Sequence, residues 1–185
     1  MKLRITSIQN FLVFLKRLKS VEKSVILELT KDSLFSKVHT ADKSVMKYTS
    51  ILLSDVMEGD VDWTKLKTDR VKIVHSQEDA VAQFKIYQSD FTTILSLCGM
   101  ETNSEEVLAF EINEKNAHSF GDSFRYKLNL GASEITTSES VISNIYKGQL
   151  SYMEAETCQV YVHDNRLVMC SEQSSTSIAI GLVEK

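Results

Sequence analysis

The chain of 185 residues has the size of one large domain or two small ones. Hydrophobic residues make up 43% and charged residues 25% of the chain, which excludes a disordered or collagen-like protein. The net charge of −4 argues against a nucleic-acid-binding protein if only the whole chain is considered. The charges are unevenly distributed, however. Residues 1–60 carry ten Lys and Arg against seven Asp and Glu, and residues 61–185 carry eleven against eighteen, an asymmetry that bears on partners and steering.

Cysteine usage and hydropathy indicate where the protein works. The three cysteines, Cys98, Cys158 and Cys170, form no CxxC pair, which fits a reducing compartment and buried thiols. Neither these cysteines nor the four histidines have the spacing of metal ligands, and we expect no metal or cofactor. No apolar run approaches the roughly 20 residues that span a bilayer. We therefore expect a cytoplasmic protein without a membrane partner, mature from Met1.

The first sixty residues predict a strand, a helix and three strands. Residues 2–7 alternate apolar and polar side chains, which is typical of a short strand with one apolar face. Ser7 precedes a helix whose apolar residues recur along one face: Ile8, Phe11, Leu12, Leu15 and Leu18. Strands follow at 24–30, 34–40 and 45–54, and polar residues at 31–33 form the turn between the first two.

The same order of strand and helix begins twice more. The second copy is predicted as a strand at 83–88, a helix that Asp90 caps and Gly99 ends, and a strand at 106–113. The third copy is predicted as a strand, a helix and three closing strands, at 124–130, 138–147, 158–163, 166–171 and 176–183.

Short helices with narrow apolar faces cannot form a helical core, so each must lie across one face of a mostly antiparallel sheet. We therefore predict an α+β fold with helices on one face. Polar breaks near 58–69 and 114–123 are the candidate boundaries. We expect an N-terminal domain with two strand–helix units at 1–118 and a C-terminal domain with one unit at 119–185.

No motif for a phosphate-binding loop, a dinucleotide site, a metalloprotease or a serine hydrolase occurs in the sequence. His163 and Asp164 lie at a predicted hairpin turn without a neighbouring nucleophile, and we interpret them as structural. We expect the protein not to be an enzyme, and an unrecognised enzyme is the last of our alternatives.

The strongest candidate for a functional site is the basic end of the first predicted helix. It contains Lys16, Arg17 and Lys19, and Lys23 lies just beyond it. The simpler interpretation is a solvated face beside a buried one. The sharper interpretation is that these side chains contact phosphates, which gives salt-dependent affinity without sequence readout. Aromatic residues are not interleaved with the basic ones, and no recognition helix is evident. If the protein binds nucleic acid, we expect it to follow the backbone of a duplex.

Three parts of the chain resemble DNA sliding clamps, the family that includes proliferating cell nuclear antigen and the clamps of large tailed phages. The first part lies at the start of the chain and is similar to the opening of these clamps: KLRITSIQNFLVFLKRL together with SVILELTKDSLFSKVHTADKSVMKYTSILLSDVME. The second part is similar to the strand and helix that start a later unit of the clamps: FKIYQSDFTTILSLCG. The third part lies at the end of the chain and is similar to the closing β-hairpin of the phage clamps: RLVMCSEQSSTSIAIGLVEK.

The resemblance implies a non-catalytic ring of repeated βαβββ units, with helices around a central hole and sheets outside. It implies a homo-oligomeric processivity factor for DNA replication, of phage or other viral origin. Such a clamp is linked to duplex DNA, tethers a DNA polymerase and is placed on DNA by a clamp loader.

The resemblance also implies roles for particular residues. Those implied for DNA contact lie on the first and third helices or just beyond: Lys16, Arg17, Lys19, Lys23 and Lys147. The second helix, at 89–98, has no Lys or Arg, which departs from the family's pattern. The residues implied for a partner-peptide pocket are Leu52, Val56 and Met57, for which the alternative is a plain core position.

The number of units departs from the family as well. Familiar clamps carry four or six units per subunit, whereas this sequence predicts about three. A three-unit subunit needs a different number of copies to close a ring, and a monomeric processivity factor remains an alternative. A second alternative is a viral structural or assembly protein with no nucleic-acid role.

Overall fold

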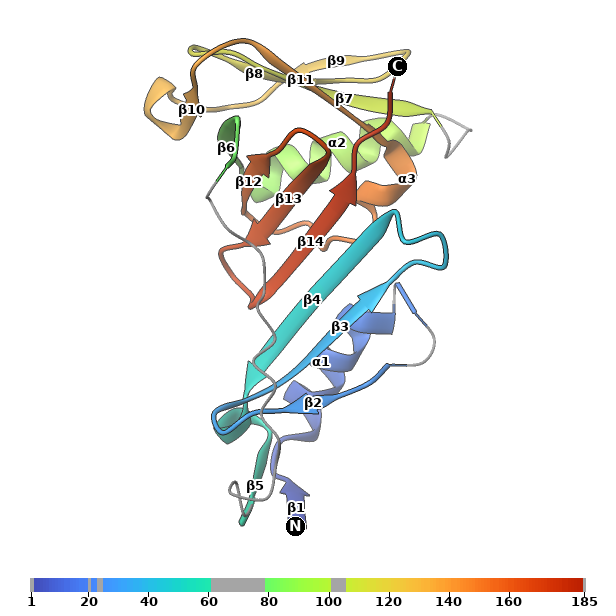
Figure 1. Cartoon of the computed structure of the whole chain (residues 1–185), viewed down its shortest axis with the longest axis vertical. Coiled ribbons are helices and arrows are strands. Elements are labelled where there is room, and N and C mark those ends of the chain that lie inside the picture. The colour runs from blue at the N-terminus through green and yellow to red at the C-terminus, as the bar shows by residue number, and fades with distance from the viewer. Residues whose placement is uncertain (1, 20, 23–24, 61–78, 101–105, 185) are drawn as a thin grey trace. The chain divides into compact units, whose positions relative to one another are not determined.

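The computed structural model of the chain describes residues 2–19, 21–22, 25–60, 79–100 and 106–184 (Figure 1). The chain divides into two compact units, Met1–Val74 and His75–Lys185. We call them unit 1 and unit 2. The boundary that we expected between residues 118 and 119 lies inside a strand of unit 2.

The described part of unit 1 contains one helix and two small antiparallel groups of strands. Its elements are β1 (Lys2–Ile5), α1 (Ile8–Lys19), β2 (Glu28–Leu29), β3 (Ser33–His39), β4 (Val45–Leu52), a 3-10 turn (Leu53–Asp55) and β5 (Met57–Asp60). Strands β2, β3 and β4 are neighbours in that order, and β1 pairs with β5. The predicted helix after Ser7 and the predicted hairpin around Asp32 are thus confirmed.

The core of unit 1 lies between α1 and the sheet of β3 and β4. Phe14 and Leu18, four residues apart on one face of α1, are fully buried. They form one cluster with Leu34 and Val38 of β3, and partly buried apolar residues surround them. Burying a large apolar side chain contributes about 1.5–3 kcal/mol, so this face fixes α1 on the sheet.

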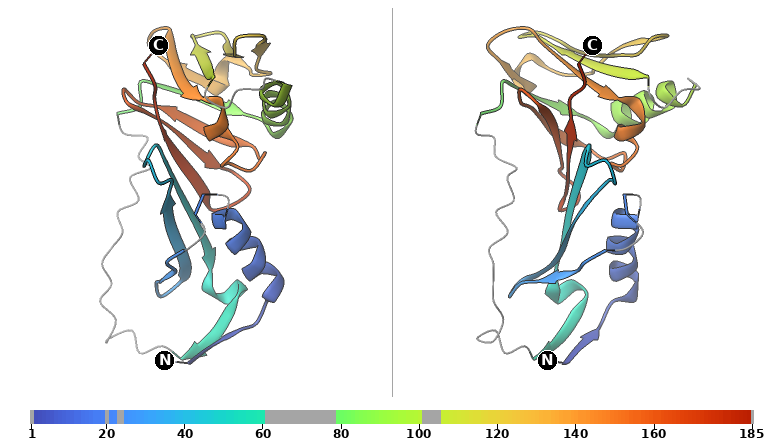
Figure 2. Two further views of the ribbon diagram at one scale, coloured as in Figure 1. Left: turned by 90° about the vertical axis from the view of Figure 1, so that its right-hand side faces the viewer. Right: turned by 45° about the vertical axis from the view of Figure 1, so that its right-hand side comes forward.

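The described part of unit 2 contains two sheets and two helices, and their arrangement can be followed in Figures 1 and 2. Its helices are α2 (Gln88–Met100) and α3 (Lys147–Leu150), with a 3-10 turn at Ala132–Glu134. Its strands are β6 (Ala82–Ile86), β7 (Val107–Ile112), β8 (Ala117–Phe120), β9 (Arg125–Lys127), β10 (Ile135–Thr137), β11 (Val141–Tyr146), β12 (Cys158–Val162), β13 (Arg166–Ser171) and β14 (Thr176–Gly181). One sheet has the order β11-β7-β8-β9, and the other has the order β10-β6-β12-β13-β14 within the unit.

Two βαβββ repeats make up unit 2, and they exchange their first strands. The first repeat runs from β6 through α2 to β9, and the second runs from β11 through α3 to β14. Strand β6 pairs with β12 of the second repeat, and β11 pairs with β7 of the first. Unit 1 contributes a third repeat, from β1 through α1 to β4. The predicted α+β fold of repeated units with mostly antiparallel sheets is therefore confirmed.

The start of the third repeat differs from our prediction. The segment at 124–130 contains β9, which closes the repeat that begins with β6, and most of the predicted helix at 138–147 is β11. The spacing of Val141, Ile142 and Ile145 fits one helix face, but β-branched residues also favour strands. Along β11 the buried Ser143 and Ile145 alternate with more accessible neighbours, the exposed Ile142 and Tyr146 and the half-buried Asn144, which is the period of a strand. Only α3, four residues long, is helical.

The three cysteines are free thiols, as expected for a protein without a disulfide framework. Cys98 and Cys158 are buried, and Cys170 is half-buried. Burial raises the pKa of Cys158 to about 12 and that of Cys170 to about 11. Both thiols are therefore protonated and unreactive at neutral pH.

His163 makes the stability of unit 2 depend on pH. The residue is buried at the turn between β12 and β13, where its backbone nitrogen donates to the Arg166 carbonyl oxygen at 2.9 Å. Burial lowers the pKa of His163, and the nearby Arg166 lowers it further. Below pH about 6.5 the unfolded chain binds a proton that the folded chain does not, so stability is lost as pH falls towards the folded pKa.

We expect the free energy of unfolding to fall between pH 7 and pH 5, and His163→Gln to reduce this fall. Urea unfolding at both pH values measures it. The same substitution at the exposed His39 is the matched control and should leave the pH dependence in place. An unchanged pH dependence in His163→Gln would show that other groups cause it.

Candidate nucleic-acid interface

The first turn of α1 is fixed by polar contacts from two directions. The Ser7 hydroxyl oxygen accepts a hydrogen bond from the Asn10 backbone nitrogen at 3.3 Å, as an N-cap residue does. The Asn10 side-chain nitrogen donates to the Asp55 carbonyl oxygen at 3.1 Å, which ties the helix to the segment after β4. With its start and its apolar face both held, α1 presents its remaining side chains in defined directions.

The last turn of α1 gathers the predicted basic residues. Lys16, Arg17 and Lys19 all lie in this turn, where cations also complement the negative end of the helix dipole. With 100° per residue, Lys16 lies opposite the buried face that Phe14 and Leu18 define, and it is exposed. Lys19 is exposed too, whereas Arg17 is half-buried and already interacts with other groups of the chain. Lys23 lies outside the described residues.

Lys147, the remaining residue predicted to contact DNA, lies in the interior of unit 2. Its side chain is only 6% exposed, and its ammonium group pairs with the Glu106 carboxylate at 2.9 Å. Its backbone nitrogen donates to the Glu106 carbonyl oxygen at 3.0 Å. A phosphate would have to displace this buried partner, so the structure corrects our prediction: Lys147 holds α3 to the start of β7.

Among the helices that the structure describes, α1 alone exposes basic side chains. The last turn of α2 has no basic residue, and its sequence from residue 88 to 100 contains neither Lys nor Arg. The charge of the whole units follows the same division. Unit 1 carries 14 Lys and Arg against nine Asp and Glu, a net charge of +5, and unit 2 carries seven against 16, a net charge of −9.

The three residues predicted for partner binding do not share one environment. Leu52, at the end of β4, is 57% exposed, and Met57 is half-buried. Both line a pocket of about 330 Å³ whose other walls come from residues 31–32, 53–54 and 58–59. Val56 is fully buried, and its carbonyl oxygen accepts the Thr6 backbone nitrogen at 2.8 Å. Val56 is therefore a core residue, which corrects its prediction as a partner contact.

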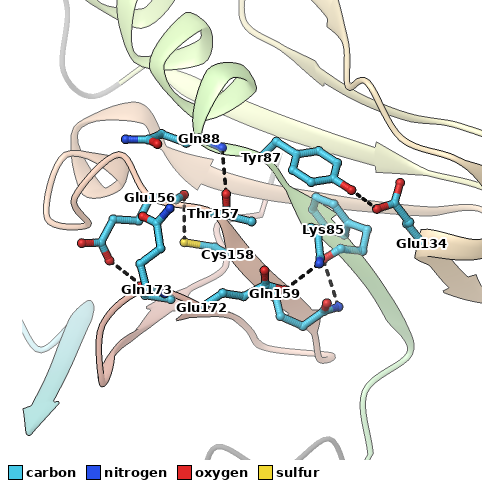
Figure 3. A network of polar contacts seen from close by, with 12 residues as sticks. Lys85, Tyr87, Gln88, Glu134, Glu156, Thr157, Cys158, Gln159, Glu172 and Gln173 are labelled. Carbon is cyan, nitrogen blue, oxygen red and sulfur yellow. Dashed lines mark hydrogen bonds and ion pairs between the residues drawn. The ribbon is translucent and has the colours of Figure 1, made fainter.

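A polar network in unit 2 was not evident from the sequence (Figure 3). The Lys85 ammonium contacts the Glu172 carboxylate at 2.7 Å, and the Tyr87 hydroxyl donates to the Glu134 carboxylate. Lys85 lies on β6 and Tyr87 directly follows its last residue, and the Lys85 ammonium lies 5.7 Å from the centre of the Tyr87 ring. The other two members, Glu134 and Glu172, lie 47 or more residues further along the chain, so no local sequence pattern indicates the network.

The charges of this network are fixed at neutral pH. The hydrogen bond from Tyr87 lowers the pKa of Glu134, and the same bond raises the pKa of Tyr87. The contact with Glu172 raises the pKa of Lys85. Glu134 is therefore ionised, Tyr87 neutral and Lys85 charged. The adjacent polar pocket of about 340 Å³ thus has no group among these three that exchanges a proton near pH 7.

Two further observations concern the described part of the chain. It contains no group of three or more His, Cys, Asp or Glu side chains that could hold a metal ion. None of its helices is long and apolar enough to cross a membrane.

No protein-family model matches the sequence, and no curated protein matches it. Solved structures do match. The DNA polymerase III subunit beta of Pseudomonas aeruginosa has a TM-score of 0.70 and 12% identity, over 100% of this chain and 65% of that one. PCNA from Thermococcus kodakaraensis has a TM-score of 0.69 and 6% identity, over 98% and 100%. PCNA from A. fulgidus, solved with the C-terminal region of FEN-1, has a TM-score of 0.66 and 10% identity, over 100% and 99%.

These matches define the fold of the chain as that of DNA sliding clamps. They extend over all or nearly all of this chain, which confirms the fold that the resemblance implied. The chain spans 66% of the matched beta subunit of Eubacterium rectale and 65% of that of P. aeruginosa.

Proposed function

We propose that the protein is a non-catalytic DNA sliding clamp, a processivity factor that encircles or follows duplex DNA and tethers a DNA polymerase. The observation that carries the proposal is the exposed pair Lys16 and Lys19 at the end of α1, in a chain with the sliding-clamp fold. Flexible lysines on a rigid helix suit contact with phosphates, because such contacts position a protein on DNA without reading its sequence.

The division of charge supports the same function. A basic unit 1 attracts the phosphate backbone, and an acidic unit 2 repels it, so DNA is directed towards α1. The acidic net charge of the whole chain is then no obstacle to DNA binding. It limits non-specific attachment of DNA to the sheets of unit 2.

Other parts of the proposal concern partners. The H. pylori beta clamp and the A. fulgidus PCNA were solved with a DNA ligase peptide and the C-terminal region of FEN-1, respectively. We propose that this chain also binds partner peptides, and that Leu52 and Met57 offer apolar surface in the pocket of unit 1. A clamp loader places the protein on DNA, and it acts as a homo-oligomeric ring in the cytoplasm, that of the host cell if the protein is viral.

The proposal is tested by measuring the affinity for a labelled duplex between 50 and 300 mM salt, together with the mass in solution by light scattering. We expect log affinity to fall linearly with log salt, with a slope of about −0.9 for each phosphate contact. A strict monomer that does not bind duplex DNA at low salt would overturn the proposal. An oligomer whose mass does not change with salt and that does not bind DNA would instead support the alternative function, a viral structural or assembly protein.

A further inference from the structure

Unit 2 shows how two repeats complete each other. The first strand of each repeat pairs antiparallel with the second strand of the other, β6 with β12 and β11 with β7. Strand β6 has β10 on its opposite edge, so both of its edges are paired. The fully buried Ile86 at the end of β6 shows that this exchange also covers apolar side chains.

Unit 1 contains a single βαβββ repeat, so it has only half of the paired arrangement that unit 2 shows. Strand β1, the equivalent of β6, pairs with β5 along one edge, as β6 does with β10. Its other edge has no strand partner among the described residues. Strand β2, the equivalent of β7 and β12, pairs with β3 alone in the described part of the chain. The two strand edges that the exchange would use are therefore open, and open edges favour pairing with another chain.

Apolar side chains are exposed on the same segments. Of the ten large apolar side chains that are exposed among the described residues, six lie on β1, on α1 or just before β2: Ile5, Ile8, Leu12, Val13, Ile26 and Leu27. Ile8 and Leu12 are four residues apart and share one face of α1, on the first turns rather than the basic last turn. The exposed surface of α1 is thus apolar at its start and basic at its end. Clustered apolar surface of this kind marks a protein contact.

We propose that a second copy of the chain completes unit 1, with β1 of each copy pairing antiparallel with β2 of the other. The charges of the two strands agree with this occupant, because β1 carries Arg4, whose guanidinium pairs with Glu58 of β5 at the strand surface, and β2 carries the exposed Glu28. Opposite charges on paired strands stabilise the pairing. A two-fold exchange uses the same surface on both copies, so it is self-complementary.

This inference rests on the repeats and not on the proposed DNA function. It has one consequence for that function, however. The single repeat in unit 1 of one copy is completed by the single repeat in unit 1 of a second copy. A ring built in this way therefore contains an even number of subunits.

The first test is a matched pair of substitutions, Ile8→Glu and Ile142→Glu. Both residues are exposed isoleucines, with exposed fractions of 68% and 57%, but Ile142 lies on β11 of unit 2. Light scattering after size-exclusion chromatography should give the full-length protein a mass of two or four times 20.9 kDa. We expect Ile8→Glu to halve this mass and Ile142→Glu to leave it unchanged. Circular dichroism checks that both variants remain folded.

The second test is a cross-link between copies. Arg4→Cys and Glu28→Cys are made in separate full-length chains, mixed and oxidised with oxidised glutathione. The yield of disulfide-linked dimer should be several times higher in the mixture than in either variant alone. The unsubstituted chain, oxidised in the same way, shows how much cross-linking its own three cysteines cause. A monomer at all concentrations, a trimer, or a mass that Ile142→Glu lowers and Ile8→Glu does not, would overturn the inference. A dimer without DNA affinity would refute the clamp proposal and leave this inference standing.

Discussion

Replacing Lys16 and Lys19 together by Glu is expected to weaken duplex binding by about 10- to 100-fold near 0.1 M salt. Both side chains are exposed on the last turn of α1 and lie away from its buried face, so the substitutions remove phosphate contacts without disturbing the core. The slope of log affinity against log salt should decrease in size by about 2, because two counterion-releasing contacts are lost. Fluorescence anisotropy with a labelled duplex at several salt concentrations measures both quantities.

The matched control changes the net charge by the same amount in unit 2. Lys115 lies between β7 and β8 and Lys127 lies on β9, and both are exposed. Replacing both by Glu should leave the salt slope unchanged and alter the affinity only through the weaker long-range field. Equal losses in the two double variants would contradict a specific interface on α1, because net charge alone would then explain DNA binding.

Phe14→Ala is expected to lower the free energy of unfolding of unit 1 by about 3–5 kcal/mol. Phe14 is fully buried in the cluster that joins α1 to β3, and its loss leaves a cavity where the helix meets the sheet. Hydrogen exchange of the α1 and β3 amides should accelerate, while the amides of unit 2 should stay protected. DNA affinity should fall as well, because the basic last turn is no longer held in place.

Val13→Ala is the control for this substitution. Val13 is the neighbour of Phe14 on α1 but is exposed, so the same truncation to Ala should cost less than about 1 kcal/mol. If Phe14→Ala and Val13→Ala have similar small effects on exchange in unit 1, the packing of α1 on β3 and β4 does not hold this unit together.

The sequence predicted those elements in which local pattern and tertiary packing agree. The apolar spacing from Ile8 to Leu18 indicated the helix, and the charge of Lys16 and Lys19 indicated its exposed basic end. The buried face was predicted only in part, because Phe14 is buried together with Leu18, whereas Ile8 and Leu12 are exposed. The alternation along β6 was equally direct, and burial alternates along this strand in the structure. The closing strands of unit 2 were predicted within two residues of their observed bounds. In these strands the local preference matches the place in the fold.

The prediction was wrong where one local pattern allowed two structures. Val141, Ile142 and Ile145 fit a helix face by spacing, but pairing with β7 makes the segment a strand. Lys147 looked like an exposed helical lysine because its partner, Glu106, lies 41 residues earlier in the chain. The exchange of β6 and β11 between repeats likewise depends on distant pairing, which periodicity does not encode.

The candidate site was predicted in part for the same reason. Exposure of Lys16 and Lys19 follows from one helix, so the sequence alone indicated it. The carbonyl oxygen of Val56 accepts the backbone nitrogens of Thr6 and Ser7, far away in the sequence. Met57 packs against the cluster that contains Phe14 and Leu18, and a single strand end reveals neither contact. Residues that depend on one element were therefore predicted better than those that depend on several.

The central claim is that copies of this chain enclose duplex DNA, and electron microscopy of the purified full-length protein tests it most directly. We expect averaged particle images to show a hollow disc whose opening admits a double helix and whose mass corresponds to an even number of chains. Solid particles without a central opening would contradict the claim.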